Sequence, residues 1–436
     1  MSTAVTDAAV RVPAGFATLA GRAVAYAAVP LSLVAGPTIE SIVGMIFCVY
    51  AVAIIGVVAA WRGAPIPKLV ADIGYVFFAC FALLFAVELI NGDVFATPRP
   101  GNADFFGTYM ILLAAPFFVI GLSVLRVDRR HFEWAIIATV SVTAVWTVYQ
   151  YGVQGFSRAS GFNGLNPNTM GMIVLLWGLF LLASALRGPK PDGILLIGAL
   201  IALIPTALAA SKIVWACCIV GYTIIFVWWA ISWKRWRTLA SISILTIAVI
   251  GASLQFSFVQ DRISQMSEDF GAFLVSGDTS GGTFGIRVAA WIGGLHAFLA
   301  QPFIGHGLAD VRIAALTYRP DWVTDFSYLW HLHNQYVTNL VAFGFLGLAF
   351  LIAFLGVFAY VAWRARDEGV RRFCAVAPIV IAAYISVELL FPRTPLYGTV
   401  FVLLGLCMLI VTRQEEDERR SSIYSRISKA SEARRP

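Results

Sequence analysis

Two histidines lie at the edge of an apolar run, in the segment His331-Leu332-His333-Asn334, although the chain has only 5 histidines. Imidazole can take a proton from a hydroxyl group near neutral pH, and it can also ligate a transition metal. An amide such as that of Asn334 can hold a hydroxyl group or orient a neighbouring ring. The segment therefore indicates either proton transfer or metal binding at the boundary between water and an apolar region.

Zinc is a common partner of paired histidines. On a helix, however, residues i and i+2 point to nearly opposite faces, so His331 and His333 would chelate one ion well only from an extended segment. The sequence has no His-x-x-x-His or Glu-x-x-His pair beside them. We therefore expect no metal and no other cofactor.

The elements that carry these residues are predicted to be membrane-spanning helices. The 436-residue chain is 59% hydrophobic and 13% charged, with a mean hydropathy of +0.81, which is far more apolar than a soluble protein of this length. The apolar runs predict about twelve spans of roughly 20 residues. They lie at residues 17–36, 40–61, 69–90, 107–125, 133–153, 169–186, 192–210, 212–233, 238–257, 335–362, 374–391 and 397–412.

The sequence thus predicts an all-α, polytopic membrane protein with one long loop. We divide it into N-terminal spans at 1–256, the long loop at 257–334, C-terminal spans at 335–412 and a tail at 413–436. The tail is charged and poor in apolar residues, which predicts a solvated or disordered end.

Orientation follows from the short loops. Their basic residues occur in alternate loops, which predicts that these loops face the cytoplasm, as do both termini. The same placement explains the formal net charge of +7, so we expect no nucleic-acid binding.

The long loop then faces the other side of the membrane. Within this loop, residues 283–300 predict an amphipathic helix whose Trp291 and Phe298 suit a membrane interface.

Basic residues on that other side carry more information, because orientation does not explain them. They are Arg158, Lys212, Arg262 and Arg287. Arginine offers permanently charged, bidentate donors to phosphate oxygens, so such a set near a membrane surface suits a pyrophosphate group. The alternative is that each one pairs with a local acid or caps a helix. Glu88 and Glu388, near outer helix ends, are interpreted as solvated or as partners of arginine, for example Glu388 with Arg393.

Longer motifs surround the histidines. After His333-Asn334 come nine residues and then Gly344-x-x-Gly347. This spacing resembles the signature of the bacterial O-antigen ligase and polymerase superfamily. Three further segments resemble motifs of the same family: Gly285-x-Arg287 with Trp291, Gln301-Pro302-x-x-Gly305-x-Gly307, and Asn166-Pro167-Asn168-x-x-Gly171.

The resemblance implies an all-helical membrane glycosyltransferase that takes a glycan from undecaprenyl pyrophosphate. Its ligase branch transfers the glycan to the lipid A core oligosaccharide, on the periplasmic face of the bacterial inner membrane, without ATP or a required metal. By resemblance, His333 would be the base that activates the acceptor hydroxyl group, and Arg287 and Arg262 would hold the pyrophosphate.

The remaining site residues follow less directly. Arg158 would be a third phosphate ligand, and Lys212 stands where the family has arginine after serine, so its role is in doubt because lysine offers a point charge rather than a fork. His331 would orient its neighbour or bind the acceptor, and the alternative is a plain interfacial histidine without a role in the reaction. Asn334 would hold the histidine or a substrate hydroxyl group.

Three functions remain open from the sequence. The first is the ligase reaction, which we favour. The second is a polymerase of the same superfamily, or a related exopolysaccharide or protein glycan transferase, because these share the donor and its chemistry. The third is a transporter or flippase of lipid-linked sugars, for which charges at the middle of the bilayer would be expected.

Overall fold

The computed structural model shows an all-helical chain. It describes residues 16–34, 39–92, 105–240, 282–329, 331–391 and 394–432, together with single residues and short pieces between 251 and 271. Every regular element in these parts is a helix. Of these helices, 7 are long and apolar enough to cross a membrane by length and composition. The predicted all-α, polytopic fold class is thus confirmed.

The helices before the long loop follow the predicted spans closely. They are α1 (Phe16–Val34), α2 (Ile39–Trp61), α3 (Lys68–Asn91), α4 (Phe105–Val124), α5 (Arg129–Gly152), the 3₁₀ turn η1 (Phe162–Gly164), α6 (Pro167–Ala185), α7 (Gly193–Ile201), α8 (Leu203–Leu208) and α9 (Lys212–Ser232). One predicted span is divided between α7 and α8, because Pro205 has no N–H to donate to the carbonyl of Ile201. The predicted span at 238–257 lies mostly outside the described residues.

The helices of the C-terminal part include two short ones from the long loop. They are α12 (Gly282–Ala300), α13 (Val311–Thr317), α14 (Gln335–Phe343), α15 (Phe345–Arg364), α16 (Glu368–Ile385) and α17 (Thr394–Glu432). The predicted helix at 283–300 corresponds to α12.

The predicted span at 335–362 is broken at Gly344, where φ is +61°. A side chain there would clash with the carbonyl group of Pro302, and the same carbonyl accepts a hydrogen bond from Phe345 N at 2.8 Å. Only glycine fits a left-handed backbone in such close contact. The turn after α12 and the break between α14 and α15 therefore fit together, which lets α14 begin at the edge of the bundle.

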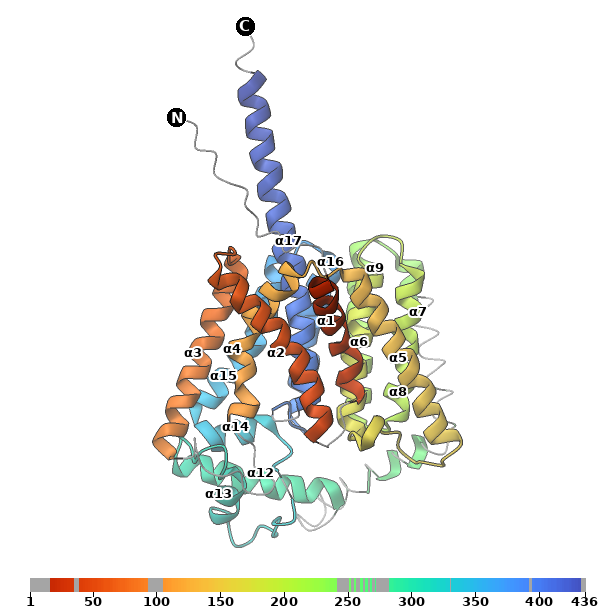
Figure 1. Ribbon diagram of the computed structural model, residues 1–436. Helices are drawn as coiled ribbons and strands as arrows, with labels where there is room; N and C mark the ends of the chain where they lie inside the picture. The colour runs from red at the N-terminus through yellow and green to blue at the C-terminus, as the bar shows by residue number, and fades with distance from the viewer. Residues whose placement is uncertain are drawn as a thin grey trace.

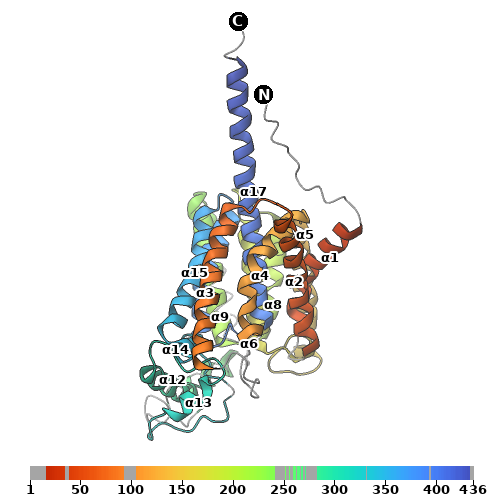
Figure 2. The same cartoon turned by 60° about the vertical axis from the view of Figure 1, so that its left-hand side comes forward.

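The core of the bundle is formed by α6 and the first half of α17. Almost every residue of α6 is buried, and so is most of the apolar part of α17. The outer helices, such as α3, α9 and α15, expose large apolar side chains, as helices in contact with lipid do. Figure 2 shows α17 passing through the middle of the bundle.

The two ends of the bundle differ. We call the end from which α17 projects the tail end, and the opposite end, which α12 and α13 cover, the loop end (Figure 1). The basic connections predicted to face the cytoplasm meet at the tail end, where Arg129 pairs with Asp367 at 2.7 Å and Arg413 donates to the carbonyl of Val127 at 2.9 Å.

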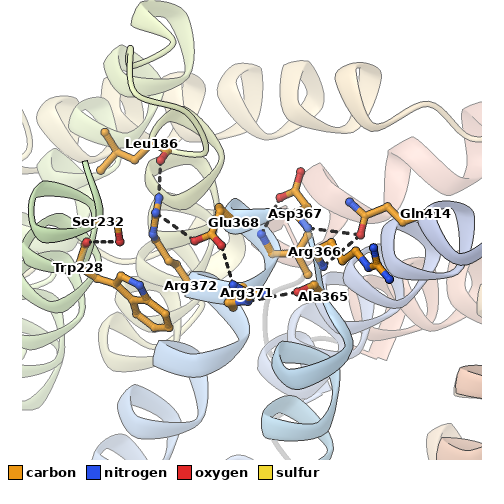
Figure 3. Close-up of polar contacts among 11 residues, drawn as sticks. Leu186, Trp228, Ser232, Ala365, Arg366, Asp367, Glu368, Arg371, Arg372 and Gln414 are labelled. Atoms are coloured by element: carbon orange, nitrogen blue, oxygen red, sulfur yellow. Dashed lines mark hydrogen bonds and ion pairs between the residues drawn. The ribbon is translucent and has the colours of Figure 1, made fainter. Parts of the chain in front are cut away.

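Polar contacts at the tail end join α16 to its neighbours (Figure 3). Arg372, whose side chain is fully buried, donates to the carbonyl of Leu186 and lies 3.1 Å from Glu368. Arg371 lies 2.7 Å from the same glutamate, and Gln414 of α17 accepts from the backbone N–H of Asp367 at 3.3 Å. These contacts fix the positions of the helix ends.

The tail is helical, which the sequence analysis did not predict. Residues 413–432 continue α17 as an exposed helix beyond the bundle (Figure 1). The tail is solvated, as predicted. Its described part is helical because extending an existing helix avoids the unfavourable step of helix nucleation.

Candidate functional site

A polar cluster at the loop end is centred on Glu388, in the segment after α16. The carboxylate accepts a hydrogen bond from the Asn168 amide at 2.6 Å, and Arg287 lies 3.6 Å from the same oxygen, Oε1. His333 Nδ1 lies 3.6 Å from the other oxygen, Oε2. The Glu388 side chain is only 7% exposed. Residues from four distant segments therefore meet at one buried carboxylate.

Arg158 extends this cluster. Its guanidinium group donates to the Asn168 side-chain oxygen at 2.6 Å and to the carbonyl of Ala209 at 3.2 Å. Asn168 thus accepts a hydrogen bond from the Arg158 cation and donates one to the Glu388 carboxylate. Asn166 caps the start of α6 by accepting from Asn168 N at 2.8 Å, so the Asn-Pro-Asn motif sets both the helix start and this side chain.

His333 has an uncommon backbone, with φ at +51°. A non-glycine residue in the left-handed region is strained by about 1–3 kcal/mol, and such strain is concentrated at functional sites. The ring of His331 lies 4.0 Å from that of His333, measured between centroids. The two imidazoles and the carboxylate are therefore adjacent, and they are the residues of this site with the chemistry to hold a metal.

Gln335 explains why His333 and Glu388 are neighbours. Its side-chain oxygen accepts hydrogen bonds from Leu390 N at 3.0 Å and from Phe391 N at 2.9 Å. Gln335 is buried, and its amide N–H donates to Asn339 at 2.6 Å. Because Gln335 follows His333 by two residues and Leu390 follows Glu388 by two, this bond joins the two chain segments beside the site.

Trp291 explains the position of Arg287. Its indole N–H donates to the carbonyl of Leu332 at 2.9 Å, directly before His333. Residues i and i+4 of a helix share a face, so α12 presents Trp291 to the histidine segment and Arg287 to Glu388. The Arg-Trp spacing seen in the sequence thus has a structural basis.

Electrostatics keep Glu388 ionised. Burial raises the pKa of this carboxyl group, but His333, Arg287 and the Asn168 hydrogen bond outweigh burial and lower the pKa to about 2. A buried, ionised carboxylate beside imidazole stabilises positive charge on that ring. The site can therefore support an imidazole that gains a proton during a reaction.

Not every predicted site residue joins this cluster. Arg262 and the proposed Glu388 partner Arg393 lie outside the described residues. Lys212 is the first residue of α9, three positions after Ala209, whose carbonyl binds Arg158. Asn334 caps α14, accepting from Val337 N at 3.1 Å, which is a structural role.

The two outer acids were interpreted as solvated or as partners of arginine. Neither is solvated, because both are buried, but Glu388 does have an arginine partner in Arg287. Glu88 is buried and accepts from the backbone N–H of Leu308 at 2.7 Å, which holds the long loop on α3. Glu388, Asn168 and Gln335 were missed as site residues. Asn168 stood in a motif, and Gln335 directly followed His333-Asn334, but no local signal in the sequence pairs either of them with the segment at 388–391.

The fold and the site define a polytopic, all-helical membrane protein with a buried polar cluster of arginine, histidine and glutamate at one end of its bundle. The family model for O-antigen ligase matches residues 195–352, which include Arg287, Trp291, His331 and His333. This match supports the resemblance to the O-antigen ligase and polymerase superfamily that the sequence motifs indicated. A search of the curated proteins gives no match.

Proposed function

We propose that the protein transfers a glycan, as O-antigen ligase does, from undecaprenyl pyrophosphate to the lipid A core oligosaccharide. The observation that carries this proposal is the grouping of His333, Glu388 and Arg287 at 3.6 Å contacts in one buried cluster. It supplies a proton acceptor and a phosphate ligand side by side, which a glycosyl transfer from a pyrophosphate requires.

Arginines would bind the donor. Arg287 lies at the edge of the cluster with a 28% exposed side chain, so one face of its guanidinium group remains for a ligand. Arg158 lies one hydrogen bond further out, and Arg262 is proposed as a further ligand from the sequence. As the bond to the sugar breaks, negative charge grows on the pyrophosphate, and preorganised donors stabilise such charge by several kcal/mol.

His333 would activate the acceptor. Because an ionised carboxylate faces Nδ1, the ring proton is favoured on Nδ1 and Nε2 is left as the proton acceptor. The acceptor oxygen attacks the anomeric carbon, its proton moves to Nε2, and undecaprenyl pyrophosphate leaves with the electrons of the broken C–O bond. Glu388 is a positioning residue that stabilises the imidazolium ion formed in this step.

The location proposed for this reaction is the periplasmic face of the bacterial inner membrane. The basic connections gather at the tail end, and such residues mark the cytoplasmic side of membrane proteins. The loop end would then be periplasmic, with residues 257–334 as the catalytic loop between the spans at 1–256 and 335–412. The donor's lipid chain would reach the site from the bilayer and the acceptor from water, with His331 at the acceptor side.

The test is a gel of lipopolysaccharide from a strain that lacks the gene, with lipid-linked glycan extracted in parallel. The proposal expects core lipid without O-chains and accumulated lipid-linked polymer. Core capped by a single repeat would instead identify a polymerase, and an unchanged ladder with no accumulated donor would overturn both. Restoration by the wild-type chain, and not by His333→Ala, would tie the result to this site.

A further inference from the structure

The histidine pair meets the condition that the sequence analysis set for chelation. Chelation required a non-helical segment, and His331 and His333 lie before α14 in non-helical backbone. The left-handed backbone of His333 turns the two rings toward one another, with centroids 4.0 Å apart. Together with Glu388 they offer three ligand atoms within 4.8 Å of one another.

The distances suit a small metal ion. Two ligand atoms on a tetrahedral zinc ion are about 3.4 Å apart, since each lies roughly 2.0–2.1 Å from the metal. His333 Nδ1 and Glu388 Oε2 are 3.6 Å apart, which is already close to that separation. The His331 ligand atom lies within 4.8 Å of both, so a small side-chain rotation brings it into reach.

His333 Nδ1 is also a buried polar atom whose hydrogen-bonding capacity is unsatisfied, because it makes no hydrogen bond to any part of the chain that the structure describes. Its contact with Glu388 is longer than a hydrogen bond. A buried polar atom without a hydrogen bond is destabilising, and a metal ion between Nδ1 and Oε2 would remove that cost.

The surroundings support the carboxylate as a ligand. Asn168 and Arg287 both contact Oε1, so Oε2 is the oxygen that faces the imidazole. Such outer contacts orient metal ligands in known sites. The charge of Arg287 repels a dication, so binding is expected to be weaker than in a structural zinc site and therefore reversible.

We propose that His331, His333 and Glu388 form an inhibitory site for a divalent transition metal such as Zn²⁺. Two imidazoles and one carboxylate are a known ligand set for zinc, with the fourth position open to water. The site would make the protein sensitive to free metal rather than dependent on it.

Inhibition follows from the tautomer of His333, and this part rests on the proposed function. A metal on Nδ1 uses the lone pair of that nitrogen, so the ring proton must lie on Nε2. Nε2 then has no lone pair for the acceptor hydroxyl group. Metal binding itself does not depend on what reaction the site performs.

Calorimetric titration of the purified full-length protein with Zn²⁺, without a histidine tag, tests the binding. We expect one bound ion, with affinity weakened in His331→Ala and in Glu388→Gln by more than the roughly 10- to 100-fold that follows the loss of an outer-shell partner. His331→Asn serves as a second variant if His331→Ala does not fold. His296→Ala removes an exposed histidine from α12 and should bind as the wild type does.

The result that would overturn the inference is the absence of binding, or equal binding by the wild type and His331→Ala. Glycan transfer measured with Zn²⁺ and then with excess chelator gives the second readout. Reversible inhibition of the wild type, and its loss in His331→Ala relative to that variant's own metal-free rate, support the whole proposal. Binding without inhibition would keep the metal site but overturn its competition with the reaction, and it would count against His333 as the proton acceptor.

Discussion

The two ends of the bundle contain the same kinds of charged residues in different arrangements. At the tail end, Arg129 lies 2.7 Å from both Glu133 and Asp367, and Arg371 and Arg372 share Glu368. At the loop end, one carboxylate, Glu388, faces Arg287, His333 and the amide of Asn168. Arg158 bonds to that amide rather than to the acid.

The difference lies in which groups surround the carboxylates. The tail-end contacts match arginines with nearby carboxylates, which satisfies both charges and joins helix ends. Among the described residues, the loop-end cluster places an arginine, a histidine and an amide around one buried carboxylate, and ionisable groups gathered in this way at a buried position often mark functional sites. Substitutions should therefore change stability at the tail end and activity at the loop end.

The largest effect is expected for His333. His333→Ala should lower glycan transfer on the order of 100- to 10,000-fold, because the proposed proton acceptor is removed, while thermal unfolding in detergent stays unchanged. His333→Asn is the matched variant, since asparagine tolerates the left-handed backbone better than alanine does. His331→Ala should have a milder effect. Wild-type activity in both His333 variants would exclude the base.

Arg287 comes next. Arg287→Ala should lower transfer on the order of 100-fold, because the pyrophosphate loses a preorganised hydrogen-bond donor. Arg287→Lys should retain only part of the wild-type activity, because lysine lacks the bidentate guanidinium group. The measurement is kcat and KM for the lipid-linked donor. If both variants lose the same amount of activity, and if that loss appears as a higher KM for the acceptor, then Arg287 does not bind the donor.

Glu388→Gln should lower transfer about tenfold, which corresponds to roughly 1.4 kcal/mol on the barrier. With a pKa of about 2, Glu388 is ionised throughout the pH range of a transfer assay. Since its pKa is lowered, its contribution to stability is present above the ordinary carboxyl pKa and is lost only as pH falls toward 2.

The acid limb of the pH–rate profile therefore does not report protonation of Glu388. Glu388→Gln should lower kcat more than it raises KM for either substrate, because the imidazolium ion formed in the step loses the charge that stabilises it. Glu88→Gln, at another buried acid of the loop end, is the control and should leave kcat unchanged. A loss through KM alone in Glu388→Gln would show that the carboxylate does not act through His333.

The sequence was sufficient for the fold class and for one side of the site. Hydropathy located the helices because a spanning helix must be apolar along its whole length, and the family resemblance of the motifs around Arg287, Trp291 and His333 pointed to the half of the cluster that comes from the loop. Glu388 was considered, with Arg393 as an example of a partner, but Arg393 lies outside the described residues. The described partners of Glu388 come from α6, α12 and the segment before α14, which are far from it in the sequence.

The features that the sequence did not reveal depend on tertiary contacts. The break at Gly344 requires the Pro302 carbonyl, and the pairing of His333 with Glu388 requires the bonds of Gln335 to Leu390 and Phe391. A glutamine inside an apolar run predicts burial with partners, but nothing in the sequence names those partners.

At the tail end, Arg372→Met should affect stability instead. The side chain is fully buried, and its loss leaves the Leu186 carbonyl without this donor. A buried acceptor left unsatisfied is destabilising by about 1–3 kcal/mol, and Glu368 retains Arg371 as a partner. Thermal unfolding in detergent should show the loss, with transfer per folded molecule unchanged. Reduced transfer at full stability would contradict the division between the two ends.

The smallest effect is expected for Arg366→Gln, also at the tail end. Arg366 lies 2.6 Å from Glu418, but its side chain is 72% exposed and that of Glu418 is 44% exposed. Exposed ion pairs are screened by solvent and contribute about 0–1 kcal/mol, so the unfolding temperature and transfer should both remain close to wild type. Comparison with Arg372→Met in the same detergent tests whether burial, rather than charge, decides the effect. A loss as large as that of Arg372→Met would mean that α17 depends on this exposed pair for its position in the bundle.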